Sequence, residues 1–215
     1  MVDIAKSPAK VSGLVLHAAA RYDFLVWLKT WGRERAFREQ MLSFARLRMG
    51  ESVLDVGCGT GALTIEAKRQ VGPLGMVCGI DASPEMIARA ERKARRAGTD
   101  VTFMEGAAQA MPFPDAHFDV VVSTLVLHHL PRKGRQQCAA EMRRVVKPHG
   151  RVLVIDFASG GSHGQRLLAH FHRHGGSKLG DIIALLSDAG LTIVESGVAG
   201  RSDMQFALAA APAGA

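Results

Sequence analysis

Residues 53–61 read VLDVGCGTG, and this short segment carries the clearest structural signal in the chain. Val53–Val56 is a short, mostly apolar run, and glycines follow it at positions 57, 59 and 61. A glycine lets the backbone turn sharply and lets another group approach closely, because it has no Cβ. The segment therefore predicts a buried strand, a tight loop and a helix whose first amide groups face a ligand.

Strands and helices alternate from this segment to the C-terminus. The helix over Pro84–Ala97 is the best defined, since Ser83 precedes it as an N-cap and Gly98 follows it at a position suited to left-handed backbone. The other predicted helices are Gly61–Val71, Gly134–Val146 and Leu179–Ala189. The predicted strands are Val53–Val56, Met76–Ile80, Val101–Met104, Phe118–Val122, Arg151–Asp156, Leu191–Glu195 and Met204–Ala209, the last two as a hairpin around Gly200.

This alternation predicts an α/β fold of the Rossmann-like, doubly wound type, with a mainly parallel seven-stranded sheet and an antiparallel closing strand. In such sheets the ligand lies outside the carboxyl ends of the strands, where the strand order reverses. Upstream, residues 11–48 read as two helices joined near Trp31. We expect residues 1–50 to form an N-terminal helical lid and residues 51–215 to form the ligand-binding domain.

The composition is typical of one globular domain. Of the 215 residues, 47% are hydrophobic and 22% charged, whereas only 6% are Phe, Trp or Tyr. The chain thus has little material for the aromatic stacking that single-stranded nucleic-acid binders use. The three cysteines, Cys58, Cys78 and Cys138, fit neither a disulfide framework nor a zinc-binding spacing. We therefore expect reduced thiols and a cytoplasmic protein.

The net charge of +7 is scattered, although residues 1–50 carry nine Lys or Arg against four Asp or Glu. We interpret this excess as a solvated basic surface. Peripheral contact with an anionic membrane, an acidic substrate or RNA stays open as an alternative.

The glycine spacing alone leaves two classes of ligand open. Gly57, Gly59 and Ala62 also match the G-x-G-x-x-G/A pattern of dinucleotide-binding proteins. Asp55 separates the two classes, because a carboxylate at the strand end would repel a pyrophosphate. S-adenosylmethionine carries a sulfonium and an ammonium and no phosphate, so an acidic site attracts it. Asp81, after the next strand, is placed to accept both ribose hydroxyls, although both aspartates also suit structural roles as caps.

At this point the sequence resembles the class I S-adenosylmethionine-dependent methyltransferases, and most of all the group that includes the ubiquinone/menaquinone-biosynthesis C-methyltransferases. Five motifs in order carry the resemblance over about half the chain: LDVGCGTG at Leu54–Gly61, GIDAS at Gly79–Ser83, MPFPDAHFDVV at Met111–Val121, LHHL at Leu127–Leu130 and KPHGRVLVID at Lys147–Asp156. The resemblance implies transfer of a methyl group from S-adenosylmethionine to a small or lipid-like acceptor, at oxygen, nitrogen or carbon, with release of S-adenosylhomocysteine.

The resemblance also implies where the cofactor would bind. Its methionine part would contact Asp55 and the Gly57–Gly61 loop, its ribose Asp81, and its adenine the segment after the third strand. The expected contacts are Asp55, Gly57, Cys58, Gly59, Gly61, Asp81, Ala82, Met86, Gly106, Ala107, Ala108 and Ser123, with Tyr22 from the N-terminal helices.

The adenine segment departs from the family pattern. Many relatives read Gly-Asp-Ala there, and the acid accepts a hydrogen bond from the adenine amino group, whereas this chain reads Gly106-Ala107-Ala108-Gln109. The Ala108 amide still has a hydrogen to donate, and Gln109 or a backbone carbonyl is the candidate replacement for the acid. We expect cofactor binding that is weakened but retained.

His128 is the candidate catalytic residue, because it follows the fourth strand, where the transferable methyl is expected, and an imidazole accepts protons near neutral pH. A packing role for His128, or transfer without any base, stays open. Four further histidines, at positions 163, 170, 172 and 174, have no neighbouring cysteine and no consistent register, so we predict no metal site.

Two alternative functions stay open. The basic balance would suit an RNA methyltransferase, although the chain shows no separate RNA-binding module and no motif for attack by a base amino group. Ala107 would suit a non-catalytic protein that binds S-adenosylmethionine without transferring its methyl group.

Overall fold

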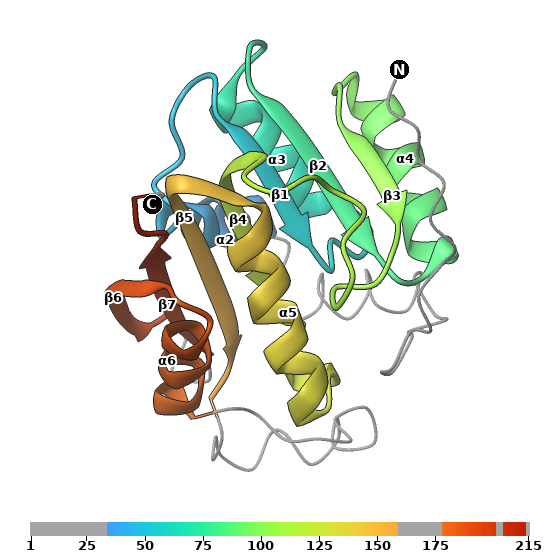
Figure 1. Cartoon of the computed structure of the whole chain (residues 1–215). Coiled ribbons are helices and arrows are strands. Elements are labelled where there is room, and N and C mark those ends of the chain that lie inside the picture. The colour runs from blue at the N-terminus through green and yellow to red at the C-terminus, as the bar shows by residue number, and fades with distance from the viewer. Residues whose placement is uncertain (1–33, 159–177, 201–203, 214–215) are drawn as a thin grey trace.

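A computed structural model describes residues 34–158, 178–200 and 204–213. They form one seven-stranded sheet in the order β3-β2-β1-β4-β5-β7-β6, with helices packed on it (Figure 1). The strands are β1 (Ser52–Val56), β2 (Met76–Asp81), β3 (Thr102–Glu105), β4 (Phe118–Thr124), β5 (Val146–Phe157), β6 (Thr192–Val198) and β7 (Met204–Ala210). The helices are α2 (Glu34–Ser43), α3 (Ala62–Val71), α4 (Pro84–Ala97), the 3-10 turn η1 (Leu127–His129), α5 (Arg132–Val145) and α6 (Leu179–Asp188).

The strand directions confirm the predicted α/β class. β1 pairs parallel with β2 and β4, and the parallel pairing continues outward to β3 and β5. β7 runs antiparallel to both of its neighbours, β5 and β6, and closes the sheet. The strand order reverses between β1 and β4, so the carboxyl ends of these two strands form the switch point at which such sheets bind ligands.

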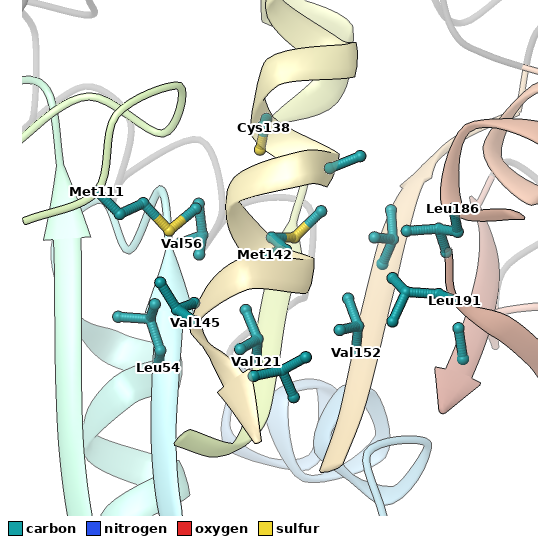
Figure 2. Close-up of a cluster of buried hydrophobic side chains, with 14 of the residues drawn as sticks. Leu54, Val56, Met111, Val121, Cys138, Met142, Val145, Val152, Leu186 and Leu191 are labelled. Atoms are coloured by element: carbon teal, nitrogen blue, oxygen red, sulfur yellow. The ribbon is translucent and has the colours of Figure 1, made fainter. Parts of the chain in front are cut away.

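Alternating side chains of the central strands supply a hydrophobic core on each face of the sheet. Leu54 and Val121 point to the face covered by α5 and α6, where they pack with Met142 and Leu186 (Figure 2). Val53, Val77, Val120 and Val122 point to the other face and pack against α2 and α3. Strands buried on both faces read as nearly continuous apolar runs, which is why the sequence revealed them clearly.

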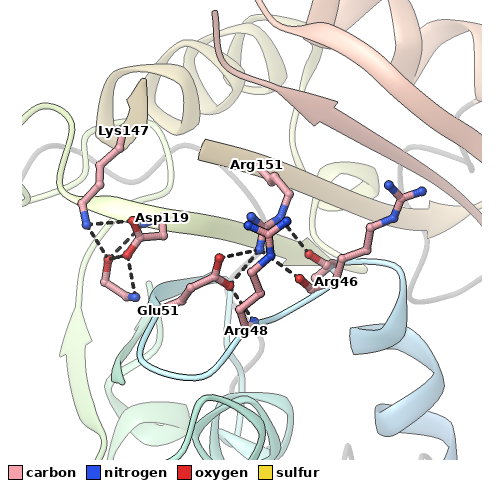
Figure 3. Close-up of polar contacts among 8 residues, drawn as sticks. Arg46, Arg48, Glu51, Asp119, Lys147 and Arg151 are labelled. Carbon is pink, nitrogen blue, oxygen red and sulfur yellow. Dashed lines mark hydrogen bonds and ion pairs between the residues drawn. The ribbon is translucent and has the colours of Figure 1, made fainter. Parts of the chain in front are cut away.

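The amino ends of the central strands are tied together by polar side chains (Figure 3). Asp119, at the start of β4, accepts hydrogen bonds from the Ser52 N–H at 2.8 Å and from Lys147 Nζ at 2.9 Å. Arg151 on β5 pairs with Glu51 before β1 at 2.8 Å. This set of residues, which we call the amino-end clamp, lies at the opposite edge of the sheet from the switch point.

The helix α4 begins and ends as its sequence predicts. Ser83 Oγ accepts a hydrogen bond from the Met86 N–H, Pro84 opens the first turn, and Gly98 has a left-handed φ of +58°. The local sequence suffices here because capping depends on side chains next to the helix itself.

Other boundaries differ from the prediction. β5 begins at Val146, five residues earlier than expected, because Val146 pairs with Phe118 before an irregularity that contains Pro148 and Gly150. β6 continues to Val198, three residues beyond the predicted end at Glu195. The prediction had no counterpart for η1. The hairpin near Gly200 is present, with the Ala199 N–H donating to Met204 O at 2.9 Å.

The N-terminal lid was predicted for residues 1–50, and most of it lies outside the described residues. Within the described part, α2 packs Met41 and Leu42 into the core beside α3. The division of the chain at residue 50 into lid and domain stays a prediction.

Candidate functional site

The glycine loop after β1 is held by the end of β2. The N–H groups of Gly57 and Cys58 donate to Ile80 O, at N···O distances of 2.8 and 3.0 Å, and the Gly59 N–H donates to Asp81 Oδ2 at 2.9 Å. These three amides are therefore paired inside the protein. A loop that binds a pyrophosphate needs such amides directed at the phosphate oxygens.

Two of the glycines are required by close packing. At Gly57, with φ +72°, a Cβ would lie 2.3 Å from Val126 Cγ2, in the segment that leads into η1. At Gly61, with φ +76°, a Cβ would lie 2.6 Å from Phe103 Cζ on β3. The loop is thus enclosed by neighbours from β3 and from the segment after β4, and only glycine fits both the dihedral angles and the space.

Asp55 lies under this loop with only 2% of its surface exposed. Its Oδ2 accepts a hydrogen bond from Thr64 Oγ1 on α3, at an O···O distance of 2.6 Å. Burial raises the pKa of Asp55 to about 7, with the Thr64 hydrogen bond opposing the shift and the charge of Asp81 adding to it. A cation placed against Asp55 would favour its charged form and lower that pKa again.

Asp81 organises both the glycine loop and the start of α4. Besides the Gly59 N–H, its carboxylate accepts a hydrogen bond from the Ser83 N–H at 2.9 Å. Burial raises the pKa of Asp81, and the backbone hydrogen bonds from Ser83, Gly59 and Ala82 oppose that rise. Each carboxylate oxygen has room for about two hydrogen bonds, so acceptor capacity for ligand hydroxyls is left.

The segment after β3 lies beside Asp81. The Gly106 N–H donates to the backbone carbonyl of Asp81 at 2.9 Å, and Ala107 is buried and pairs with Ala110 in an isolated bridge. The side-chain nitrogen of Gln109 lies 3.3 Å from where a Cβ on Gly134 would stand. Gln109 therefore lies against the first turn of α5.

β4 ends in two buried hydroxyl groups without partners. Among the described residues, Ser123 Oγ and Thr124 Oγ1 make no hydrogen bond. Ser123 lies in register with Val56 on β1 and with Val154 on β5, directly at the switch point. Because a buried hydroxyl without a partner costs about 1–3 kcal/mol, a polar ligand atom at this position would be stabilising.

His128 lies in η1 and is only 3% exposed. Its Nδ1 lies 2.6 Å from Asp156 Oδ1, and its backbone N–H donates to Asp156 Oδ2 at 2.9 Å. Its ring centroid lies 3.9 Å from that of His129 and 5.2 Å from that of Phe157. The candidate base is therefore a buried residue in a defined orientation.

Asp156 is the polar residue of this site that sequence reasoning missed. It was predicted only as the last residue of a strand. The available signal was its position, since an acid at the carboxyl end of a central strand matches the positions of Asp55 and Asp81. The structure brings together Asp55, Asp81, Ser123 and Asp156 at the carboxyl edge of four neighbouring strands.

The structure explains one of the five motifs shared with the methyltransferases, Met111–Val121. The segment Met111–Val121 is held by Arg144 on α5, which donates to Phe113 O at 2.7 Å and to Met111 O at 3.0 Å. The same guanidinium pairs with Glu141, whose Oε2 accepts from the Met111 N–H at 2.6 Å. This motif positions a loop.

Comparison with known proteins shows which proteins have a similar sequence or fold. Residues 53–150 match the family model described as a methyltransferase domain. A 157-residue stretch is 36% identical to the ubiquinone/menaquinone biosynthesis C-methyltransferase UbiE of Ralstonia pickettii, covering 73% of this chain and 64% of that enzyme. Residues 53–150 form a methyltransferase domain. The chain spans slightly less than two thirds of the length of the curated relatives that it matches first.

Solved structures show the same fold for this methyltransferase domain. A SAM dependent methyltransferase from Aquifex aeolicus matches with a TM-score of 0.73 and 23% identity, over 89% of this chain and 97% of that chain. The [4+2]-cyclase SpnF matches with a TM-score of 0.70 and 20% identity, over 84% of this chain and 82% of that chain. Because a cyclase shares this fold, the fold does not define the reaction, which depends on the residues of the site.

Some expectations lie outside the described residues of this methyltransferase domain, namely Tyr22 and the four histidines between positions 163 and 174. Within the described residues, no three His, Cys, Asp or Glu side chains are grouped so as to bind a metal ion. No helix in the same ranges is long and apolar enough to cross a membrane. Cys58, Cys78 and Cys138 are buried free thiols, as predicted.

Proposed function

We propose that this chain is an enzyme that transfers the methyl group of S-adenosylmethionine to a carbon atom of a small, lipid-like quinol. The observation that carries the proposal is the pairing of the glycine-loop amides inside the protein above two buried carboxylates. A site whose Gly57, Cys58 and Gly59 amides are already paired, and which carries two acids, disfavours a pyrophosphate and favours a cationic nucleoside without phosphate. The match of residues 53–150 to the methyltransferase domain model supports the same ligand.

We assign parts of the cofactor to the residues at the carboxyl edge. Asp55 binds the ammonium of the methionine part beside the backbone of Gly57, Cys58, Gly59 and Gly61, and Asp81 accepts hydrogen bonds from the ribose hydroxyls. Ala82 and Met86, at the start of α4, flank the ribose. Gly106, Ala107 and Ala108 face the adenine, Ser123 supplies the hydroxyl nearest the switch point, and Tyr22 covers the cofactor from the N-terminal segment.

The bound cofactor supplies an electrophilic methyl group on a sulfonium. The protein's contribution is alignment, because a nucleophile held in line with the methyl group and the sulfur reacts as if at very high concentration.

The proposed class of methyl acceptor is based on the names of the relatives. Their printed name specifies C-methylation in the biosynthesis of ubiquinone and menaquinone, and the match extends over 73% of this chain. A quinone ring becomes nucleophilic at carbon in its reduced, hydroquinone form. We further propose a cytoplasmic enzyme that reaches this acceptor at the membrane surface, with its basic residues facing anionic lipid headgroups.

The experiment is the Asp81→Ala substitution, followed by calorimetry with S-adenosylhomocysteine. We expect at least a tenfold loss of affinity, because the ribose loses an ionised acceptor and the glycine loop loses its Gly59 hydrogen bond. Asp100→Ala, which removes an exposed carboxylate just beyond α4, is the matched control and should bind like the wild type. An unchanged affinity in Asp81→Ala would contradict the assignment.

Turnover distinguishes the remaining readings. With a prenylated 1,4-naphthohydroquinone as acceptor, the wild type should release S-adenosylhomocysteine and a methylated ring. Binding without release for any quinol would support the non-catalytic alternative. RNA binding that falls steeply with salt, together with methyl transfer to RNA, would support the RNA methyltransferase alternative.

A further inference from the structure

The carboxylate of Asp156 contacts both the segment that follows β4 and its own strand. It is 0% exposed, at the carboxyl end of β5. Its Oδ1 accepts from the Phe157 N–H at 2.8 Å and faces His128 Nδ1 at 2.6 Å, while its Oδ2 accepts from the His128 N–H at 2.9 Å. One buried acid thus holds both the backbone and the ring of His128.

This arrangement determines which ring nitrogen carries the proton. An ionised carboxylate is acceptor-only, so the nitrogen that faces it must be the donor. Nδ1 of His128 therefore carries the hydrogen, and in the neutral ring Nε2 is the nitrogen that bears the lone pair in the ring plane. A carboxylate that orients an imidazole in this way also stabilises the imidazolium formed when Nε2 takes up a proton.

The same segment lies directly over the candidate cofactor loop. Val126, two residues before His128, lies where a Cβ on Gly57 would come within 2.3 Å of it. Leu125 has a left-handed φ of +60°, and its N–H donates to Ile155 O on β5 at 2.8 Å. The strained turn is therefore anchored to β5 on both sides, which holds His128 next to the carboxyl end of β5.

We propose that His128 is the general base of the reaction, acting through Nε2, and that Asp156 is the positioning residue that holds it in that tautomer. This inference rests on the proposed function and names the proton acceptor of that same site. Asp156 from β5 and His129 from η1 are titratable groups that contact the imidazole.

Proton transfer to His128 precedes methyl transfer in the proposed reaction. Nε2 takes the proton of a ring hydroxyl of the hydroquinone, and the electrons of that oxygen move to the adjacent ring carbon. This carbon bonds the methyl group as the sulfur–methyl bond breaks, and the electron pair of that bond stays on sulfur. The ring carbon then loses its hydrogen as a proton, the oxygen regains a proton, and the net products are methylated hydroquinone, S-adenosylhomocysteine and one proton.

The first test measures the tautomer and does not depend on activity. In ¹⁵N-imidazole-labelled wild type bound to S-adenosylhomocysteine, we expect His128, assigned by its absence in His128→Gln, to be protonated at Nδ1. In Asp156→Asn the carboxylate that fixes the proton on Nδ1 is lost, so the Nδ1-protonated form should lose its exclusive population and the Nε2-protonated form should appear. An Nε2-protonated ring in the wild type would overturn the proposal.

The second test measures turnover of the prenylated naphthohydroquinone. His128→Gln should lower kcat about 100-fold, in the range of general-base effects, with S-adenosylhomocysteine affinity nearly unchanged. The acid limb of the wild-type pH profile should disappear with it, because an imidazolium has no electron pair to accept a proton. Retention of wild-type kcat and of the acid limb in His128→Gln would overturn the proposal.

Two comparisons keep the outcome interpretable. Asp156→Asn combined with His128→Gln should be no slower than the slower single variant, because both act through one group. His117→Gln makes the same chemical change just before β4, at the opposite end of that strand, and should keep the wild-type rate. Failure of the wild type to bind S-adenosylhomocysteine would instead reject the proposed function, whatever the tautomer.

Discussion

Asp55 is the residue whose charge matters most for the candidate site. Because its pKa is raised to about 7, it is mostly protonated at pH 6 and mostly ionised at pH 8 in the ligand-free protein. A cationic ligand needs the ionised form, so the affinity for S-adenosylhomocysteine should rise about tenfold between these pH values, following the ionised fraction. Isothermal titration calorimetry across this range measures the effect.

Asp55→Asn is the control variant for this pH dependence. The ligand's own amino group also titrates, and the difference between wild type and variant isolates Asp55. The variant should bind more weakly at pH 8 and lack the rise. Since the folded pKa lies above the unfolded value of 3.8, the protonated carboxyl contributes stability that is lost as pH rises from the unfolded pKa to about 7. The Tm of the ligand-free variant relative to the wild type should therefore rise from about pH 4 to about pH 7 and level off above it, and a flat difference would contradict the assignment.

The glycine loop and the segment before η1 depend on each other as elements. Gly57→Ala should push Val126 and the following turn away from β1, since the new Cβ would stand 2.3 Å from Val126 Cγ2. We expect at least a tenfold loss of S-adenosylhomocysteine affinity together with a lowered Tm.

Gly50→Ala provides the matched comparison, because Gly50 also has a positive φ, +81°, yet a Cβ there would meet nothing within 4 Å. This variant carries the cost of left-handed backbone alone, about 1–2 kcal/mol, and should bind the ligand normally. Equal ligand affinity in the two variants would show that the loop and the turn are not coupled.

At the scale of the whole molecule, stability and function are separated to opposite edges of the sheet. The amino-end clamp joins β1, β4 and β5 through Asp119, Lys147 and Ser52 (Figure 3). Burial pushes the pKa of Asp119 upward, but hydrogen bonds from Ser52 and the charge of Lys147 outweigh it and hold the pKa below its usual value. The clamp therefore stabilises the fold above the unfolded pKa and loses its contribution as pH falls below about 4.

Asp119→Ala should lower the free energy of unfolding by about 1–2 kcal/mol at pH 7, measured by urea denaturation, and by less at pH 3. Ligand affinity should stay at the wild-type value, because the clamp lies at the far edge of the sheet. Asp115→Ala, whose side chain is 78% exposed, should change stability little. A loss of ligand affinity in Asp119→Ala with normal stability would contradict this separation.

The amino-acid sequence was enough to predict the α/β class, the order of most elements and the glycine loop with Asp55 and Asp81. These features leave local signals, since apolar runs, caps such as Ser83 and the spacing of glycines are read from short segments of the chain. The methyltransferase motifs were also readable in the sequence, although the role of Met111–Val121 in positioning a loop became clear only with Arg144 in place.

Three features became visible only in the folded chain: the loop amides pair with Ile80 and Asp81, Asp55 is buried, and Asp156 holds His128. Asp156 and His128 lie 28 residues apart, and no periodicity links an acid at one strand end to a histidine after another. They meet because parallel strands β4 and β5 bring their carboxyl ends to one edge. Burial at this edge removes water from the carboxylates, so they accept hydrogen bonds from protein groups instead. The same burial changes how readily Asp55 and Asp81 ionise, and so the charge that they present to a ligand.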